Sequence, residues 1–137
     1  MDALKKEEIY TIDDIYALPD GERAELIDGK IYYMAPPSWS HQRISGKLHQ
    51  TIANYIDSNN GKCEVWIIEI VSPSSKPRDY MTKLFKYRTA GVREYWIVDP
   101  DKHMTMVYEF EKDTVEQYDF GEDVPVGIYE GFTIKVE

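Results

Sequence analysis

The sequence lacks most of the features that mark secreted, membrane or metal-stapled proteins. Its single cysteine, Cys63, cannot form an internal disulfide and has no zinc-site spacing, so we interpret it as a small buried apolar residue. No apolar run approaches the length of a membrane span, and the N-terminus has no signal-peptide pattern. No glycine-rich phosphate loop or Ser/His/Asp combination is present, and the three histidines lack metal-ligand spacing to one another. We therefore expect a cytoplasmic protein with no membrane contact.

Positive charge is scarce overall but is concentrated in one segment. The formal net charge is −9, which argues against general affinity for nucleic acid, because phosphate contacts need lysine and arginine. Between Lys76 and Arg93, however, six basic residues stand against the single acid Asp79. This segment could face DNA phosphates, or it could be an ordinary solvated helix face; the charges alone slightly favour the second interpretation.

The length of 137 residues fits a single domain, residues 1–137, in which residues 1–22 form an N-terminal appendage. Thr11 and Asp14 resemble a capping box for a short helix that ends at Pro19. Residues 24–27 and 30–34 alternate as strands around Asp28-Gly29, a strong hairpin signal. The apolar positions that follow recur at helical spacing and predict an amphipathic helix over about residues 40–58.

The stretch from Val65 to Pro100 is the centre of the sequence. Residues 65–68 read as a strand buried on both faces, a helix is predicted from Pro77 to Ala90, and residues 95–98 read as a second buried strand. Such a unit implies a crossover between parallel strands. The predicted helix has an apolar face and a polar face, with Gly91 as its C-cap. The apolar face consists of Tyr80, Met81, Leu84, Phe85 and Tyr87, and the polar face of Arg78, Lys83 and Lys86.

Glu69 is the one carboxylate in the first apolar run. A buried carboxylate must become neutral, find a cation, or lie where the strand ends, and the turn residues from Ser72 onward favour the strand end. Beyond Pro100, residues 104–110 and 114–120 alternate as an antiparallel pair, and residues 131–136 suggest a last short strand after an acidic loop. The predicted fold is α/β (α+β): a mixed sheet flanked by helices, with N-terminal and C-terminal β-hairpins.

Several motifs resemble those of one known family. Residues 69–75 (EIVSPSS), a following helix with Lys-Leu-x-x-Tyr, and residues 90–100 (AGVREYWIVDP) resemble the bacterial Uma-type family of restriction-endonuclease-like proteins, a branch of the PD-(D/E)XK nuclease superfamily. The resemblance extends to residues 25–29, 34–38 and 40–42 and into the C-terminal hairpin. One departure is large: a family segment that carries a Pro-Asp strand is missing between residues 61–65 and 67–69.

The resemblance implies a restriction-endonuclease-like fold and Mg²⁺-dependent DNA hydrolysis with two carboxylates and a lysine. By motif position, Glu69 and Glu25 correspond to acidic metal ligands and Lys83 to the lysine, so Glu69, Lys83 and Glu25 are the candidate catalytic residues. Each has a structural alternative. Asp79 lies four residues before Lys83 and could form an exposed helical ion pair with it. Glu25 could be an outward residue of the hairpin.

His41 and Gln42 begin the long predicted helix, where side chains could approach a phosphate, although His41 could equally be a plain helix-start residue. Two functional hypotheses remain: an Mg²⁺-dependent endonuclease, or a degenerate remnant with weak or absent Mg²⁺ binding and little or no activity. A sheet that has lost strands exposes an edge, so we also expect a homodimer or higher oligomer with contacts at the sheet edge or at Trp66.

Overall fold

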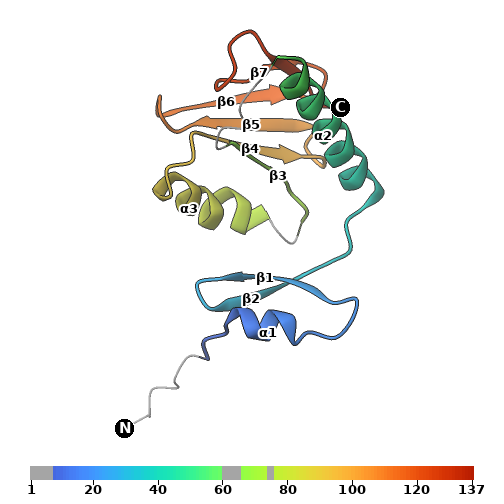
Figure 1. The fold of residues 1–137 in the computed structure, drawn as a ribbon, viewed down its shortest axis with the longest axis vertical. Helices are drawn as coiled ribbons and strands as arrows, with labels where there is room; N and C mark the ends of the chain where they lie inside the picture. The colour runs from blue at the N-terminus through green and yellow to red at the C-terminus, as the bar shows by residue number, and fades with distance from the viewer. Residues whose placement is uncertain (1–7, 60–65, 74–75) are drawn as a thin grey trace. The chain divides into compact units, whose positions relative to one another are not determined.

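The computed structural model describes residues 8–59, 66–73 and 76–137. The chain forms two compact units, residues 1–36 and residues 37–137, drawn in Figure 1. The N-terminal unit therefore extends past the predicted appendage and includes the first hairpin, while the single-domain organisation stays a prediction. Cys63 and the first residues of the predicted strand before Trp66 lie outside the described residues. No helix within the described ranges is long and apolar enough to cross a membrane.

The N-terminal unit contains helix α1 (Ile12–Tyr16) and the antiparallel strands β1 (Arg23–Ile27) and β2 (Lys30–Met34). The backbone N–H of Thr11 donates to Asp14 Oδ2 at 2.7 Å, which satisfies one free donor at the start of α1. The hairpin turn has positive φ at both Asp28 (51°) and Gly29 (75°), as a type I′ turn requires. The predicted helix and hairpin are confirmed.

The larger unit contains a mixed four-stranded sheet in the order β3-β4-β5-β6. These strands are β3 (Trp66–Ile70), β4 (Glu94–Asp99), β5 (Met104–Glu109) and β6 (Thr114–Asp119). Strands β3 and β4 are parallel, and the other two pairs are antiparallel (Figure 1). The predicted crossover between parallel strands, the C-terminal meander and the mixed sheet are therefore confirmed.

A second, two-stranded sheet pairs β7 (Asp123–Pro125) with β8 (Thr133–Lys135). The last strand was predicted, but β7 was interpreted as part of an acidic loop. Only Val124 of β7 is buried, while Asp123 and Pro125 are exposed. A three-residue strand with one buried side chain carries too short an alternation to be recognised in the sequence.

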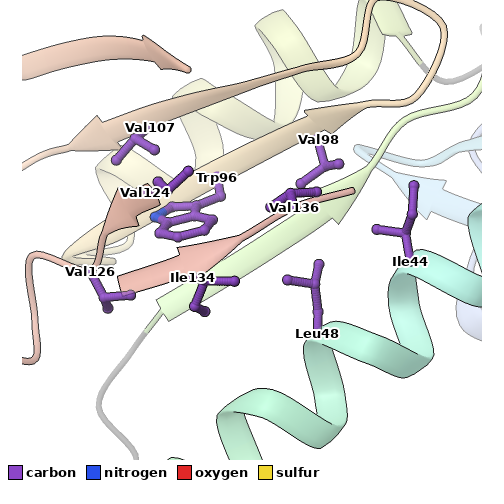
Figure 2. Close-up of a cluster of buried hydrophobic side chains, with 9 residues drawn as sticks. All are labelled: Ile44, Leu48, Trp96, Val98, Val107, Val124, Val126, Ile134 and Val136. Atoms are coloured by element: carbon purple, nitrogen blue, oxygen red, sulfur yellow. The ribbon is translucent and has the colours of Figure 1, made fainter. Parts of the chain in front are cut away.

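The larger unit has a hydrophobic core on each face of the sheet, and alternate residues of β4 enter both. On one face, helix α2 (Trp39–Ser58) and the β7–β8 pair cover Trp96 and Val98. Figure 2 shows Ile44 and Leu48 pointing from α2 toward this core. On the other face, Tyr95 and Ile97 pack with Val71 and with Tyr80, Leu84 and Tyr87 of the following helix.

The two predicted buried strands differ in burial. Every residue of β4 is buried, whereas every residue of β3 is only half-buried. The prediction that the first run is buried on both faces is therefore wrong for β3. The physical reason is its position: β4 has a neighbour on each side, while β3 lies at the edge of the four-stranded sheet formed by the described residues.

The predicted helix over residues 77–90 is confirmed, although its first part is a π-helix. This part, η1 (Arg78–Lys83), continues directly into α3 (Leu84–Thr89). Two details of its predicted faces are wrong: Met81 and Phe85 are 72% and 69% exposed, while Lys83 is buried. Asp79 and Lys83 are buried beside the inward-facing residues Tyr80, Leu84 and Tyr87, so the packed face carries charge, and Met81 and Phe85 are exposed.

The helix ends as its sequence predicts. Gly91 has φ of 81°, its N–H donates to Arg88 O, and the N–H of Val92 donates to Tyr87 O at 3.1 Å. These two bonds form a Schellman motif, in which a glycine in the left-handed region closes the last turn. The motif then leads the chain directly into β4.

Replacing Gly91 with alanine should lower the free energy of unfolding by about 1 kcal/mol, because the side chain is strained at positive φ even though no atom blocks it. Gly46 is the matched control: it lies inside α2 with open space around it. Gly46→Ala should raise stability by about 0.5 to 1 kcal/mol. Urea denaturation of both variants measures the two changes, and a Gly91→Ala variant as stable as the parent would contradict the assigned cap.

Candidate functional site

A lysine held between two carboxylates forms the most unusual polar group of the larger unit. Lys83 Nζ lies 3.3 Å from Glu69 Oε1 and 3.1 Å from Asp79 Oδ1. The hydroxyl of Tyr87 donates to the same Glu69 oxygen at 2.9 Å. We call these four residues the Lys83 cluster. Glu69 comes from β3 and the other three from the helix that follows, so the fold brings the predicted residues Glu69 and Lys83 together.

The Lys83 cluster is largely shielded from water. Asp79 is 1% exposed and Lys83 is 8% exposed, while the Glu69 side chain is 26% exposed. The expected exposed helical pair between Asp79 and Lys83 does form, but it is buried, so the surface interpretation of Lys83 is wrong. Burial of a charge is tolerated when an opposite charge is close, and here one ammonium serves two carboxylates. The formal charge of the cluster is therefore −1.

Asp79 is held mainly by electrostatics and by the local backbone. Its Oδ1 is buried and accepts no hydrogen bond from the residues that the structure describes, so its contact with Lys83 is an ion pair. The hydroxyl of Tyr95, on β4, donates to the backbone carbonyl of Asp79 at 2.9 Å. Burial raises the pKa of Tyr95, and the negative charges of Asp79 and Glu69 raise it further. The tyrosine therefore remains a neutral donor that anchors the start of the helix against the sheet.

The charge of Glu69 is stabilised by more than the position at the strand end that the sequence favoured. It does lie near the end of β3, but it also pairs with a cation and accepts a bond from Tyr87. The other predicted acid, Glu25, lies on β1 opposite Tyr32 in the N-terminal unit. The participation of Glu25 in a site with Glu69 and Lys83 stays a prediction.

The start of α2 uses its polar side chains in local contacts. Ser38 Oγ accepts from the backbone N–H of His41, and Gln42 Nε2 donates to Pro37 O. His41 Nε2 lies 2.8 Å from the carbonyl oxygen of Ile70 and donates to it, which ties the start of the helix to the end of β3. These contacts support the structural interpretation of His41 and Gln42.

A second buried acid, Asp99, was not singled out from the sequence. It is fully buried at the end of β4, 3.3 Å from Lys76 Nζ, and it accepts a bond from the hydroxyl of Tyr80. Its other oxygen accepts from the backbone N–H groups of Asp101 and Lys102, so it also shapes the turn. Burial, followed by the charge of Asp99, raises the pKa of Tyr80 to about 12. The signal available in the sequence was an acid that directly follows an apolar run.

Acidic residues from other elements compensate much of the basic segment from Lys76 to Arg93. Lys76 pairs with Asp99 and Asp101, and Lys83 lies in the Lys83 cluster. Arg88 pairs with Asp113, and Arg93 pairs with Glu111 at 2.9 Å. The local excess of positive charge read from the sequence is thus reduced by the fold.

The Lys83 cluster does not fit Mg²⁺ as it is arranged. The ion prefers near-octahedral oxygen coordination with more than one charged ligand or a substrate phosphate. Here the ammonium of Lys83 already lies between the two carboxylates, so a divalent cation would have to displace it to reach both acids. Within the described ranges, no three His, Cys, Asp or Glu side chains gather closely enough to hold a metal.

The chain is similar to a known protein family and to solved structures. A family model described as "Uma2: Putative restriction endonuclease" matches residues 12–65 and 60–137. Among solved structures, the chain is similar to one titled as a putative nuclease belonging to DUF820 from Anabaena variabilis, with 22% identity and a TM-score of 0.60. That match covers 86% of this chain and 89% of the other, and it supports the nuclease-like fold. No curated protein matches the chain.

Removing the charge of Lys83 should strongly destabilise the larger unit. Lys83→Met keeps most of the side-chain volume but leaves Glu69 and Asp79 without their cation, which should cost about 3 kcal/mol. Adding Asp79→Asn should recover part of the loss, because it removes one of the two uncompensated charges. The same change at the exposed Lys86 should cost less than about 0.5 kcal/mol. Denaturant unfolding measures all three, and equal effects at positions 83 and 86 would contradict the cluster.

Tyr80 should make stability fall with rising pH in the alkaline range. Burial and the charge of Asp99 raise its pKa to about 12 in the folded chain, whereas a tyrosine in the unfolded chain has a pKa of about 10. The unfolded chain therefore loses this proton first, so the stabilisation is complete below pH 10 and is lost as the pH rises toward 12. Unfolding curves between pH 9 and 12 should show a steeper decline for the parent than for Tyr80→Phe. Identical slopes would show that Tyr80 titrates normally.

Proposed function

The chain belongs to the Uma2 family and has a nuclease-like fold, and from this we propose that it is a degenerate nuclease-like domain with little or no hydrolytic activity. Hydrolysis of a phosphodiester by a metal-dependent nuclease needs charge stabilisation at the phosphate and a positioned water. Both requirements fall on the candidate residues Glu69 and Lys83. The proposal depends on what these residues already contact.

The observation that carries the proposal is the sharing of one ammonium by two carboxylates. Glu69 accepts from Tyr87 and pairs with Lys83, so its nearest oxygen is already occupied. Lys83 is paired with the buried Asp79 as well, and its charge is more than neutralised where it lies. A lysine in this arrangement has little net attraction left for a phosphate, and Glu69 has no adjacent open partner for Mg²⁺.

The proposed loss of the Pro-Asp segment supports the same conclusion. The family model matches in two pieces that meet around residues 60–65, which is where we propose that the segment is missing. The acid of that segment would be the second metal ligand by resemblance. The chain contains two other Pro-Asp pairs, Pro19-Asp20 and Pro100-Asp101, but neither aspartate is proposed as a substitute for this ligand. Asp101 in particular lies in the turn after β4, where it pairs with Lys76.

DNA remains the proposed partner class, with weak binding. The basic segment is the proposed contact surface, but several of its side chains are paired with acids from other elements. Because the chain carries a net charge of −9, long-range repulsion should oppose approach of a nucleic acid. Any binding should therefore weaken steeply as salt increases.

One observation favours the competing function, an active Mg²⁺-dependent endonuclease. Glu69 and Lys83 converge from separate elements, and the Glu69 side chain keeps 26% of its surface exposed. Activity would require Lys83 to move away from the carboxylates and a further acid to be supplied by Glu25 or by a second subunit. Asp79 also lies beside Lys83, but it is almost fully buried and therefore poorly placed to bind a hydrated metal ion.

A cleavage assay distinguishes the two functions. We expect no cleavage of supercoiled or linear DNA in Mg²⁺ or Mn²⁺ at enzyme concentrations in excess of the substrate. Glu69→Gln and Lys83→Ala are assayed beside the parent, and Lys86→Ala serves as the exposed control on the same helix. Circular dichroism of each variant separates loss of the fold from loss of activity.

Cleavage by the parent and by Lys86→Ala that both Glu69→Gln and Lys83→Ala abolish, with the fold retained, would overturn the proposal and establish the endonuclease. Cleavage that survives in both variants would point to a contaminating nuclease. The assay would then be repeated with repurified protein, for which we expect no cleavage. Absence of cleavage in all samples supports a degenerate domain.

A further inference from the structure

An apolar groove of about 260 Å³ lies between α2 and the edge strand β3. Trp66, Ile68 and Ile70 of β3 form one side of it, and α2 forms the other. The α2 side consists of Ser45, Leu48, His49, Ile52 and Ile56, with Tyr129 nearby. The indole Nε1 of Trp66 is buried there, and it has no hydrogen-bond partner in the part of the chain that the structure describes. A buried donor without an acceptor is costly, so the packing around Trp66 at this groove is not optimal.

The backbone of β3 beside this groove is also available for pairing. The N–H of Val71 donates to Val98 O, so by strand alternation the backbone groups of Glu69 and Ile67 also face β4. Those of Trp66, Ile68 and Ile70 therefore point away from β4. The bond from His41 to the Ile70 carbonyl agrees with this direction and uses one of the two lone pairs of that carbonyl. The outward backbone groups of Trp66, Ile68 and Ile70 therefore offer donors and acceptors to another strand.

The edge lacks the features that normally keep edge strands apart. Charged side chains, proline and bulges prevent edge-to-edge pairing in most sheets. Strand β3 contains four apolar residues and Glu69, whose side chain lies on the face of the sheet opposite the groove, beside Lys83. The contact surface is therefore neutral and apolar, although the chain as a whole is acidic.

We propose that the groove and the β3 edge together bind a second copy of this chain. A second copy presents the same short apolar strand with the same edge, which pairs with no other strand in the described part of the larger unit, so one two-fold contact serves both molecules at once. Antiparallel pairing centred on Ile68 places Trp66 of each strand opposite Ile70 of the other. In this register, Ile68 of one copy lies opposite Ile68 of the other. The two grooves then form one continuous groove, which is lined on its α2 sides by Ser45 and His49.

The charge of the surface favours a second copy over a partner of opposite charge. A basic partner would be drawn to the exposed acids of the chain and would gain nothing from this neutral groove. Two copies, in contrast, bring no charged side chain of β3 into the contact, since strand alternation places Glu69 on the sheet face opposite the groove, beside Lys83. The inference does not depend on nuclease activity.

The mass in solution tests the proposal. Light scattering and sedimentation at high micromolar concentration should give twice the chain mass of 16.0 kDa. His49→Glu puts a charge on the groove side of α2 at an exposed position and should weaken the dimer at least tenfold without unfolding the chain. Gln50→Glu, also exposed on α2 but away from this groove, is the matched control and should leave the dimer unchanged.

A crosslinking experiment tests the register. In a Cys63→Ser background, Ile68→Cys should form a disulfide-linked dimer on oxidation, because the two strands approach within disulfide range at the two-fold axis. Val115→Cys, on the opposite edge strand β6, should not do so above background. A parent chain that stays monomeric would overturn the proposal. The same holds if the groove of the monomer binds an extended peptide of a different protein. A dimer that is insensitive to His49→Glu and does not crosslink at position 68 would also overturn it.

Discussion

The packing of the helix formed by η1 and α3 against the sheet depends on the ammonium of Lys83. This helix buries Asp79 beside aromatic residues of the core, and Glu69 reaches the same place from β3. Neither carboxylate would be tolerated there without a cation. Lys83 supplies it to both, at 3.3 and 3.1 Å. The charged face of the helix can therefore pack inward together with Tyr80, Leu84 and Tyr87, and its outward face keeps Met81 and Phe85 in solvent.

The central strand β4 explains why the polar groups gather where they do. It is buried along its whole length, yet it begins and ends with an acid. Glu94 accepts from Trp96 Nε1 and from the backbone N–H groups of Gly127 and Ile128, and Asp99 closes the turn after the strand. Both acids are satisfied by contacts that hold neighbouring segments in place. Burial of an ionisable group in this fold is therefore a common structural device and does not by itself indicate catalysis.

The sequence predicted the elements that depend on local signals and missed those that depend on tertiary contacts. The Asp28-Gly29 turn and the Gly91 cap were predicted correctly because their backbone conformations restrict which residues fit. The inward face of the helix was assigned by hydrophobicity, so Lys83 was placed outside; its position depends on Glu69, which is fourteen residues away in the sequence and adjacent only in the fold. Likewise, Asp99 and β7 are recognised only once their partners Lys76 and β8 are placed.

The persistence of Glu69 and Lys83 in the chain has a physical explanation that does not require activity. Loss of the lysine would leave Glu69 and the buried Asp79 uncompensated, and loss of either acid would remove one of the two ion pairs of the buried lysine. Substitution of one residue at a time therefore costs stability even if no phosphate is ever bound. A site that once combined a lysine with acids can keep these residues as a buried ion-pair network after hydrolysis is lost. Their presence at motif positions therefore does not by itself indicate hydrolysis, because the same contacts stabilise the fold.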